Sequence, residues 1–147
     1  MNESDNHSHY GSSRVTAPRR VIASAVDRLG RAFTIDDLVA EVRAVAPGVG
    51  TATVYRAVAA MEEAHAVERV GTREESALYV RCTADGHHHH LVCTGCGIVA
   101  HAHCPLETDA ARHGSDGFVV TGHELTLYGL CAGCAANMPP ADELQRS

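Results

Sequence analysis

"TATVYRAVAAMEEAHAVERV", residues 51–70, changes its apolar spacing part-way along, and that change decides the predicted fold. Val54, Val58 and Met61 recur at the spacing of one helix face, so the first part predicts an amphipathic helix. From residue 66 the apolar spacing becomes two, which is typical of a strand. A second such segment, 77–81, follows a polar stretch, and the two segments together predict a β-hairpin.

Two more helices are predicted upstream of this stretch. One begins at Pro18 and ends before Gly30, because Pro in a first turn and Gly after a last turn are typical helix boundaries. The other begins at Thr34, which can form a capping box with Asp37, and ends at "APG", residues 46–48. The apolar faces are Val21, Ile22, Ala25, Val26 and Leu29 in the first helix, and Ile35, Leu38, Val42 and Val45 in the second.

Three helices followed by a hairpin is the order of a winged helix-turn-helix, whose third helix enters the major groove of DNA. Thr51, Thr53, Tyr55 and Arg56 gather at the N-terminal end of the third helix, away from its apolar face. Arginine can pair bidentately with guanine, so this face predicts DNA contact. The alternative is a small α+β domain without a DNA partner.

The charge distribution places any nucleic-acid surface in the first half of the chain. The formal net charge is −6, which argues against indiscriminate binding to polyanions. Arginines nevertheless cluster early, at Arg14, Arg19, Arg20, Arg28 and Arg31, whereas residues 86–147 contain Arg112 and Arg146.

Cysteine spacing is the strongest signal in the 147 residues. No apolar run is long enough to span a bilayer and the polar start lacks the features of a signal peptide, so the protein is expected to be cytoplasmic. In a reducing compartment, two Cys-x-x-Cys pairs favour a closed structural zinc site over disulfides. The ligands are Cys93, Cys96, Cys131 and Cys134; buried reduced cysteines are the alternative.

Four consecutive histidines, residues 87–90, precede the first cysteine pair. Successive side chains of a strand point to opposite faces, so His87 and His89 should serve one metal site and His88 and His90 another. A solvated polar run without metal is the alternative. The segment "HAHC", residues 101–104, adds His101, His103 and Cys104, which either bind a further ion, assist one of these sites or are simply exposed.

The second half predicts a small α/β domain. Two strands are expected around the first cysteine pair, a short helix over 105–114, and a long strand over 117–131 that leads to the second pair. Its sheet edges are candidates for pairing between subunits. The expected organisation is a disordered lead (1–13), a winged-helix domain (14–82), a hinge (83–86), a metal-binding dimerisation domain (87–136) and a flexible tail (137–147), which makes the chain α+β.

The segments "TATVYRAVAAMEEAHAV", "HHHHLVCTGCG" and "HELTLYGLCAGC" resemble, in this order, the Fur family of bacterial metal-responsive repressors. The resemblance covers roughly residues 14–136. It implies a homodimer that binds double-stranded operator DNA with an AT-rich palindrome, through Thr53, Tyr55 and Arg56 on the recognition helix. It also places Arg19 and Arg20 near phosphate contacts.

The resemblance further implies which residues bind the regulatory metal. Glu68, Cys82, His88 and His90 match the regulatory set of the zinc-sensing branch, and His87, His89, Glu107 and His123 match a second site. Glu107 is the least secure of these, because the segment before it is one residue shorter than in close relatives. A thiolate ligand favours zinc over a harder ion.

The sequence therefore predicts a zinc-responsive repressor of zinc-homeostasis genes, with two or three zinc ions per subunit. No membrane or small-molecule substrate is expected. An iron, nickel or peroxide sensor of the same family is the main alternative, and a zinc-binding module without DNA binding is a second. An enzyme is not expected, since four protein ligands at each metal would leave no position for substrate.

Overall fold

The structure is a computed structural model that describes residues 9–83, 88–104 and 119–138. The chain divides into two compact units, Met1–His88 and His89–Ser147. No helix in the described ranges is long and apolar enough to cross a bilayer.

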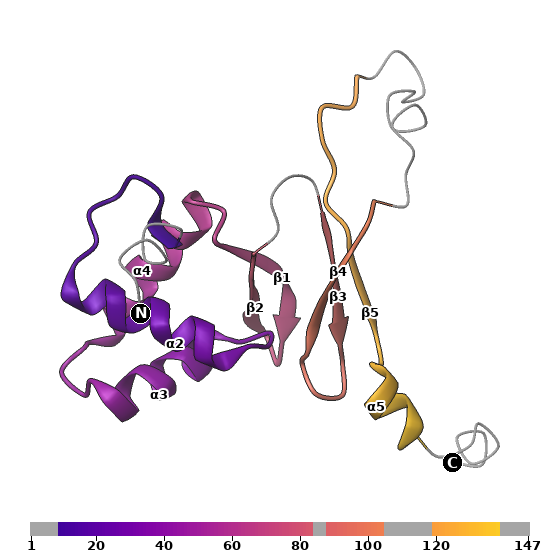
Figure 1. Cartoon of the computed structure of the whole chain (residues 1–147), viewed down its shortest axis with the longest axis horizontal. Coiled ribbons are helices and arrows are strands. Elements are labelled where there is room, and N and C mark those ends of the chain that lie inside the picture. Colours follow the sequence, from indigo (N-terminus) through magenta and orange to yellow (C-terminus); the bar gives the residue numbers. More distant parts are fainter. Residues whose placement is uncertain (1–8, 84–87, 105–118, 139–147) are drawn as a thin grey trace. The chain divides into compact units, whose positions relative to one another are not determined.

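The first unit has the predicted order of elements (Figure 1). Its helices are α2 (Ala17–Leu29), α3 (Ile35–Val45) and α4 (Thr51–Glu63), and its antiparallel strands are β1 (Val67–Arg73) and β2 (Ser76–Arg81). Gly30 closes α2 with φ 57°, a left-handed conformation that glycine adopts without strain. Thr34 and Asp37 form the predicted capping box at the start of α3.

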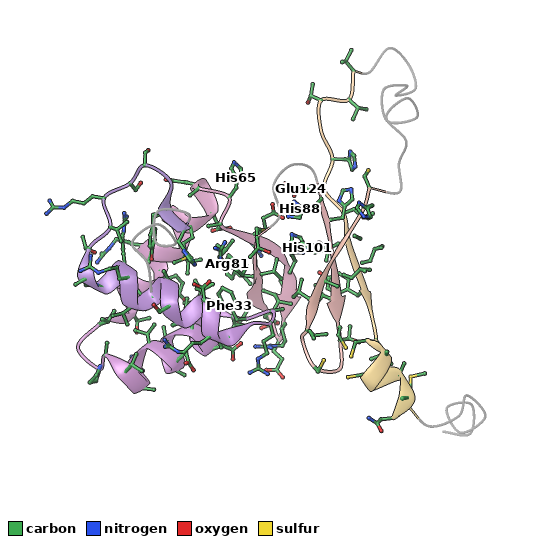
Figure 2. All side chains as sticks on the ribbon, viewed as in Figure 1. Phe33, His65, Arg81, His88, His101 and Glu124 are labelled. Atoms are coloured by element: carbon green, nitrogen blue, oxygen red, sulfur yellow. The ribbon has the colours of Figure 1, made fainter. Side chains whose placement is uncertain are left out.

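Apolar side chains from the helices and the hairpin fill the core of the first unit. Ile22, Leu38, Val54 and Met61 are fully buried, as the helical spacing predicts. Phe33 (labelled in Figure 2) is also fully buried. Its backbone exchanges hydrogen bonds of 2.9 and 2.8 Å with Tyr79 of β2, and the two rings stack. This pairing joins the β1–β2 hairpin, the wing of the fold, to the segment between α2 and α3.

Two expectations for the first unit are wrong. Val45 was expected in the core but is 59% exposed, because it is the last residue of α3 and lies beyond the packed part of that helix. The lead over residues 1–13 was expected to be disordered; residues 1–8 lie outside the described residues, but in the described part His9 is 2% and Tyr10 1% exposed. Tyr10 belongs to the apolar core, so fixed structure begins earlier than composition indicates.

The second unit contains β3 (His89–Cys93), β4 (Val99–Ala102), β5 (Thr126–Gly129) and the short helix α5 (Ala132–Ala136). Its described strands form a sheet of order β4-β3-β5, in which β4 is antiparallel and β5 parallel to the central β3 (Figure 1). This topology brings the start of β3, the end of β4 and the start of β5 to one end of the sheet. The opposite end carries the turns next to the cysteines.

Within the described residues 119–131, the expected long strand is reduced to the four residues of β5, which pair with residues 90–93 of β3. The helix expected over 105–114 lies outside the described residues, as do most of the hinge and the tail. Helices followed by a small sheet domain confirm the predicted α+β class and the two-part architecture.

Candidate metal centres and nucleic-acid interface

The four predicted cysteines meet at one end of the second unit's sheet. Cys93 ends β3, Cys96 lies in the following turn, and Cys131 and Cys134 lie at the start of α5. Their sulfur atoms all lie within 4.8 Å of one another, and those of Cys96 and Cys131 are 3.8 Å apart. With Zn–S bonds of about 2.3 Å, sulfur atoms of a tetrahedral site are separated by roughly 3.8 Å, so the donor set fits zinc.

The surroundings of Cys93 favour its thiolate, whereas those of Cys134 favour the thiol. Backbone N–H groups of Cys131 and Cys96 point at Cys93, and these hydrogen bonds lower the pKa of its thiol to about 6. Hydrogen bonds with Cys131, Cys93 and Cys96 raise the pKa of Cys134 to about 12, because a further thiolate would crowd negative charge. A bound dication would relieve that repulsion.

Gly95 gives the cysteines room. A Cβ atom at this position would lie 2.9 Å from the Cys134 sulfur, closer than real Cβ contacts. The turn between Cys93 and Cys96 therefore needs glycine at position 95. The space that a side chain would occupy there is taken by the sulfur of Cys134, one of the predicted zinc ligands.

A second group of donors lies within the first unit. The ligand atoms of Glu68 on β1, Cys82 after β2 and His88 lie within 4.8 Å of one another. Cys82 is 5% exposed, and burial, followed by the charge of Glu68, raises the pKa of its thiol to about 12. One thiolate, one carboxylate and one imidazole form a donor set that suits zinc.

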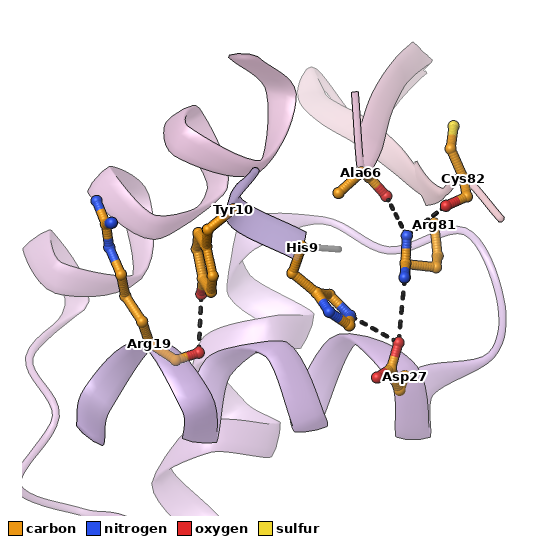
Figure 3. A network of polar contacts seen from close by, with 7 residues as sticks. All are labelled: His9, Tyr10, Arg19, Asp27, Ala66, Arg81 and Cys82. Carbon is orange, nitrogen blue, oxygen red and sulfur yellow. Dashed lines mark hydrogen bonds and ion pairs between the residues drawn. The ribbon is translucent and has the colours of Figure 1, made fainter. Parts of the chain in front are cut away.

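A polar network supports the backbone at Cys82 (Figure 3). Asp27 on α2 accepts from Arg81 at 3.1 Å and contacts the buried His9 ring at 2.9 Å. The Arg81 guanidinium also donates to the carbonyl oxygens of Ala66, at 2.9 Å, and of Cys82. Buried His9, which lies in the segment expected to be disordered, anchors this network through Asp27.

The four consecutive histidines, residues 87–90, span the boundary between the two units. His88 is the last residue of the first unit, whereas His89 and His90 begin β3 and are 1% and 2% exposed. The His90 ring lies beside that of His101, with 5.5 Å between centroids. His87 and Glu107, both predicted for the second site, lie outside the described residues.

The remaining predicted members of the second site, His89 and His123, do meet, and Cys104 joins them. His123 Nε2 lies 3.2 Å from His89 Nε2 and 3.1 Å from Cys104 Sγ. The sequence left the role of Cys104 open. Its position after β4 became informative only with the strand order, which places it beside the start of β3.

The outward face of α4 carries the predicted DNA-contacting residues. Tyr55 is 53% exposed and Arg56 is exposed, with its guanidinium 3.3 Å from the hydroxyl of the half-buried Thr53. The buried residues Val54, Ala57, Val58 and Met61 occupy the other face. Arg20 is exposed, but Arg19 is half-buried; its guanidinium lies 5.0 Å from the centre of the Tyr10 ring and donates to the Arg14 carbonyl.

Comparison with known proteins identifies the family to which these features belong. The profile of the ferric uptake regulator family matches residues 11–128. The chain belongs to this family. Members of the ferric uptake regulator family are dimeric, DNA-binding, metal-responsive transcription regulators and not enzymes, and this chain shares that general function.

Individual relatives differ in the metal named with them. The ferric uptake regulation protein of Campylobacter jejuni is 30% identical, over 84% of this chain and 81% of that protein. The iron-containing regulator structure from Francisella tularensis is 25% identical with a TM-score of 0.62, covering 85% of this chain and 96% of that one. A zinc-bound manganese uptake regulator is 28% identical with a TM-score of 0.57, covering 87% and 97%. Overall similarity therefore does not identify the metal of this chain, which has to be inferred from the ligand atoms.

Proposed function

We propose that the chain is a zinc-responsive transcriptional repressor of zinc-homeostasis genes, with zinc as corepressor. The observation that carries this proposal is the group formed by Glu68, Cys82 and His88. A buried thiolate among the donors favours zinc over Fe²⁺ or Mn²⁺, which prefer harder ligands. We assign His90 of the second unit as the fourth ligand, as the sequence predicts.

The proposed switch follows from where these residues lie. Glu68 is on the wing, Cys82 follows β2, and His88 and His90 flank the boundary between the units. Zinc would tie these segments together and reduce the freedom of each DNA-binding unit. Since two half-sites demand a fixed spacing, a dimer that is ordered before it meets DNA binds more tightly. Coupling of about 1–3 kcal/mol is typical of such linkage.

The DNA-binding face in this proposal is the exposed side of α4. Tyr55 and Arg56 would reach base edges, with Thr53 holding the Arg56 guanidinium, and Arg20 would meet phosphate. Because Arg19 stacks on Tyr10, we assign it to positioning the first helix as well as to the phosphate contact that the sequence predicts. The expected operator is a palindrome rich in A·T pairs, bound in the cytoplasm.

The dimer is proposed to form through the sheet of the second unit. Leu91, Ala100 and Leu127 are cross-strand neighbours, and all are partly or largely exposed. Ile98, Tyr128 and Leu130 add exposed apolar area nearby and line a cavity of about 200 Å³ with Leu91. A second copy of the chain would cover this apolar surface, which is large for a small unit.

The three groups of donors support the proposed two or three zinc ions per subunit. The four cysteines would hold a permanent ion, and the Glu68, Cys82, His88 and His90 set an exchangeable one. A third ion would bind at the site predicted from the sequence, with His87, His89, Glu107 and His123 as ligands. Of these ligands, His89 and His123 belong to the described residues.

The test is an operator-binding titration with Zn²⁺, Fe²⁺ and Ni²⁺ in turn, using wild-type protein and Cys82→Ser. We expect Zn²⁺ to promote binding at the lowest free concentration, and Cys82→Ser to stay dimeric while losing the response. A Cys82→Ser protein that responds at wild-type zinc would overturn the assignment. Stronger promotion by iron or nickel would favour the alternative sensors.

A second variant pair tests the DNA face. Arg56→Ala should weaken operator binding by roughly 1–3 kcal/mol and relax specificity at one position of each half-site. Arg28→Ala is a matched control, since Arg28 is already paired with Glu41 at 2.9 Å. If wild-type protein binds no DNA sequence specifically at any metal concentration, the result would favour the alternative of a zinc-binding module without DNA binding.

A further inference from the structure

The end of the second unit's sheet opposite the four cysteines brings three metal-binding side chains together. His89 begins the central strand, Cys104 follows the end of the antiparallel β4, and His123 precedes the parallel β5. The strand directions therefore force these residues to one end of the sheet, although they are far apart in sequence.

The three ligand atoms lie close enough together for one ion to bind all of them. With Zn–N bonds of about 2.05 Å and Zn–S bonds of about 2.3 Å, tetrahedral ligand atoms are roughly 3.4 Å (N to N) and 3.6 Å (N to S) apart. His123 Nε2 lies 3.2 Å from His89 Nε2 and 3.1 Å from Cys104 Sγ. All three ligand atoms lie within 4.8 Å of one another.

A simple row of hydrogen bonds explains this arrangement less well. A ring nitrogen carries either one hydrogen or one lone pair, directed along one line, so it makes one good hydrogen bond. His123 Nε2 has two neighbours at hydrogen-bonding distance, one sulfur and one nitrogen. Atoms that converge in this way are expected when each directs a lone pair at a common cation.

We propose that His89, Cys104 and His123 bind a metal ion through a Cys thiolate and two imidazoles, and that this ion is zinc or another borderline divalent cation. The thiolate is the new element, because the sequence assigned this site a carboxylate. Sulfur shifts the preference from Mn²⁺ and Fe²⁺ toward Zn²⁺. His89 is 1% exposed while Cys104 and His123 are half-buried, so two ligands can be reached by an exchanging ion.

This inference deepens the proposed function by giving the third ion a ligand and a selectivity, and it rests on that function only for its regulatory meaning. It predicts that Zn²⁺ protects Cys104 from a small alkylating reagent. The experiment uses the full chain, with alkylation of each cysteine followed by mass spectrometry at increasing Zn²⁺ or Mn²⁺. We expect Zn²⁺ to slow modification of Cys104 at least about tenfold, and Mn²⁺ to have little effect at equal concentration.

Two variants separate ligation from general shielding. His123→Ala should abolish the protection of Cys104, whereas His103→Ala should preserve it, because His103 is exposed and lies next to Cys104. Equal alkylation rates with and without Zn²⁺, or protection that survives His123→Ala, would overturn the proposal.

Cobalt gives an independent measurement of the thiolate. Cys82→Ser removes the thiol of the proposed regulatory set, so Co²⁺ added to zinc-loaded Cys82→Ser protein should produce sulfur-to-metal charge-transfer absorption from Cys104. Adding Cys104→Ser should remove it, and bound zinc, counted before and after, shows whether the four-cysteine ion has stayed. An unchanged band with unchanged zinc would count against the proposal.

Neither measurement involves DNA, so the two proposals fail separately. Protection of Cys104 in a protein that ignores its operator would leave this site standing and remove the repressor function. Zinc-dependent operator binding with an unprotected Cys104 would do the reverse.

Discussion

The two units of this chain hold their structures by different means. The first buries a continuous apolar core that includes Ile22, Phe33, Leu38 and Met61. In the described residues of the second, 89–104 and 119–138, the side chains less than a tenth exposed are His89, His90, Val92 and Cys93. Apolar burial needs no cofactor, whereas under the proposed function the second unit gains folding free energy from the ion at its four cysteines. In that proposal, metal is a folding element in one half of the chain and a signal in the other.

The largest expected effect comes from removing the four-cysteine ion. Cys131→Ser should lose the zinc and unfold the second unit, because structural zinc contributes on the order of 10 kcal/mol to folding. Hydrogen exchange should show lost protection in β3 and retained protection in α3, with zinc counted on the same sample. Cys104→Ser, a control with the same chemical change, should keep this zinc. Normal protection of β3 in Cys131→Ser would mean that the second unit folds without it.

A substitution in the core of the first unit should destabilise that unit and leave the second unit and its zinc unchanged. Leu38 is fully buried, so Leu38→Ala is expected to reduce the free energy of unfolding of the first unit by about 2–5 kcal/mol. Zinc content at the cysteines should not change. The control is Val45→Ala in the same helix, where the side chain is 59% exposed and the change should stay within about 0.5 kcal/mol. Denaturant unfolding measures both.

Much of the difference between the two units could be predicted from the sequence, and the predictions that failed did so for physical reasons. Helix boundaries at Gly30 and Thr34 and the paired cysteines are local signals, readable from a few neighbouring residues. The burial of Tyr10 could not be read from its polar surroundings, because it depends on the tertiary contact with Arg19. The role of Cys104 stayed open in the sequence because strand order, not spacing, brings it to His123.

Gly95 offers a finer test of the zinc end. Gly95→Ala places a Cβ atom 2.9 Å from the Cys134 sulfur, and such overpacking typically costs about 1–3 kcal/mol. Zinc should pass faster to a competing chelator as a result. Gly133→Ala is the matched control, since no atom beyond the neighbouring residues and the backbone of its own helix lies within 4 Å of the added carbon. Equal release from both variants would show that the turn adjusts at no cost.

The smallest expected effect concerns acid stability of the first unit. Burial alone would raise the pKa of Asp37, but hydrogen bonds from Thr34 and Arg73, with the Arg73 charge, outweigh it and hold the pKa below its usual value. A carboxyl whose pKa is lowered by folding stabilises the native state above its unfolded pKa, about 3.9, and this contribution is lost as pH falls through the folded value.

Asp37→Asn should therefore cost about 0.5–1 kcal/mol at neutral pH and flatten the loss of stability below about pH 4. Thermal unfolding of the first unit across pH measures the difference. Asp36→Asn, at the exposed neighbouring position, should follow the wild-type profile. An Asp37→Asn profile that parallels wild type would assign the cap no role in acid stability.

The burial of His9 and Tyr10 has a practical consequence for anyone who produces this protein. A version trimmed to begin at Arg14, where the first helix approaches, would lack an aromatic ring from the core and the imidazole that Asp27 contacts. Such trimming would disturb the support of Arg81 and, through it, the Cys82 carbonyl. A poor zinc response in such a shortened protein would therefore reflect the truncation and would not by itself test the metal ligands.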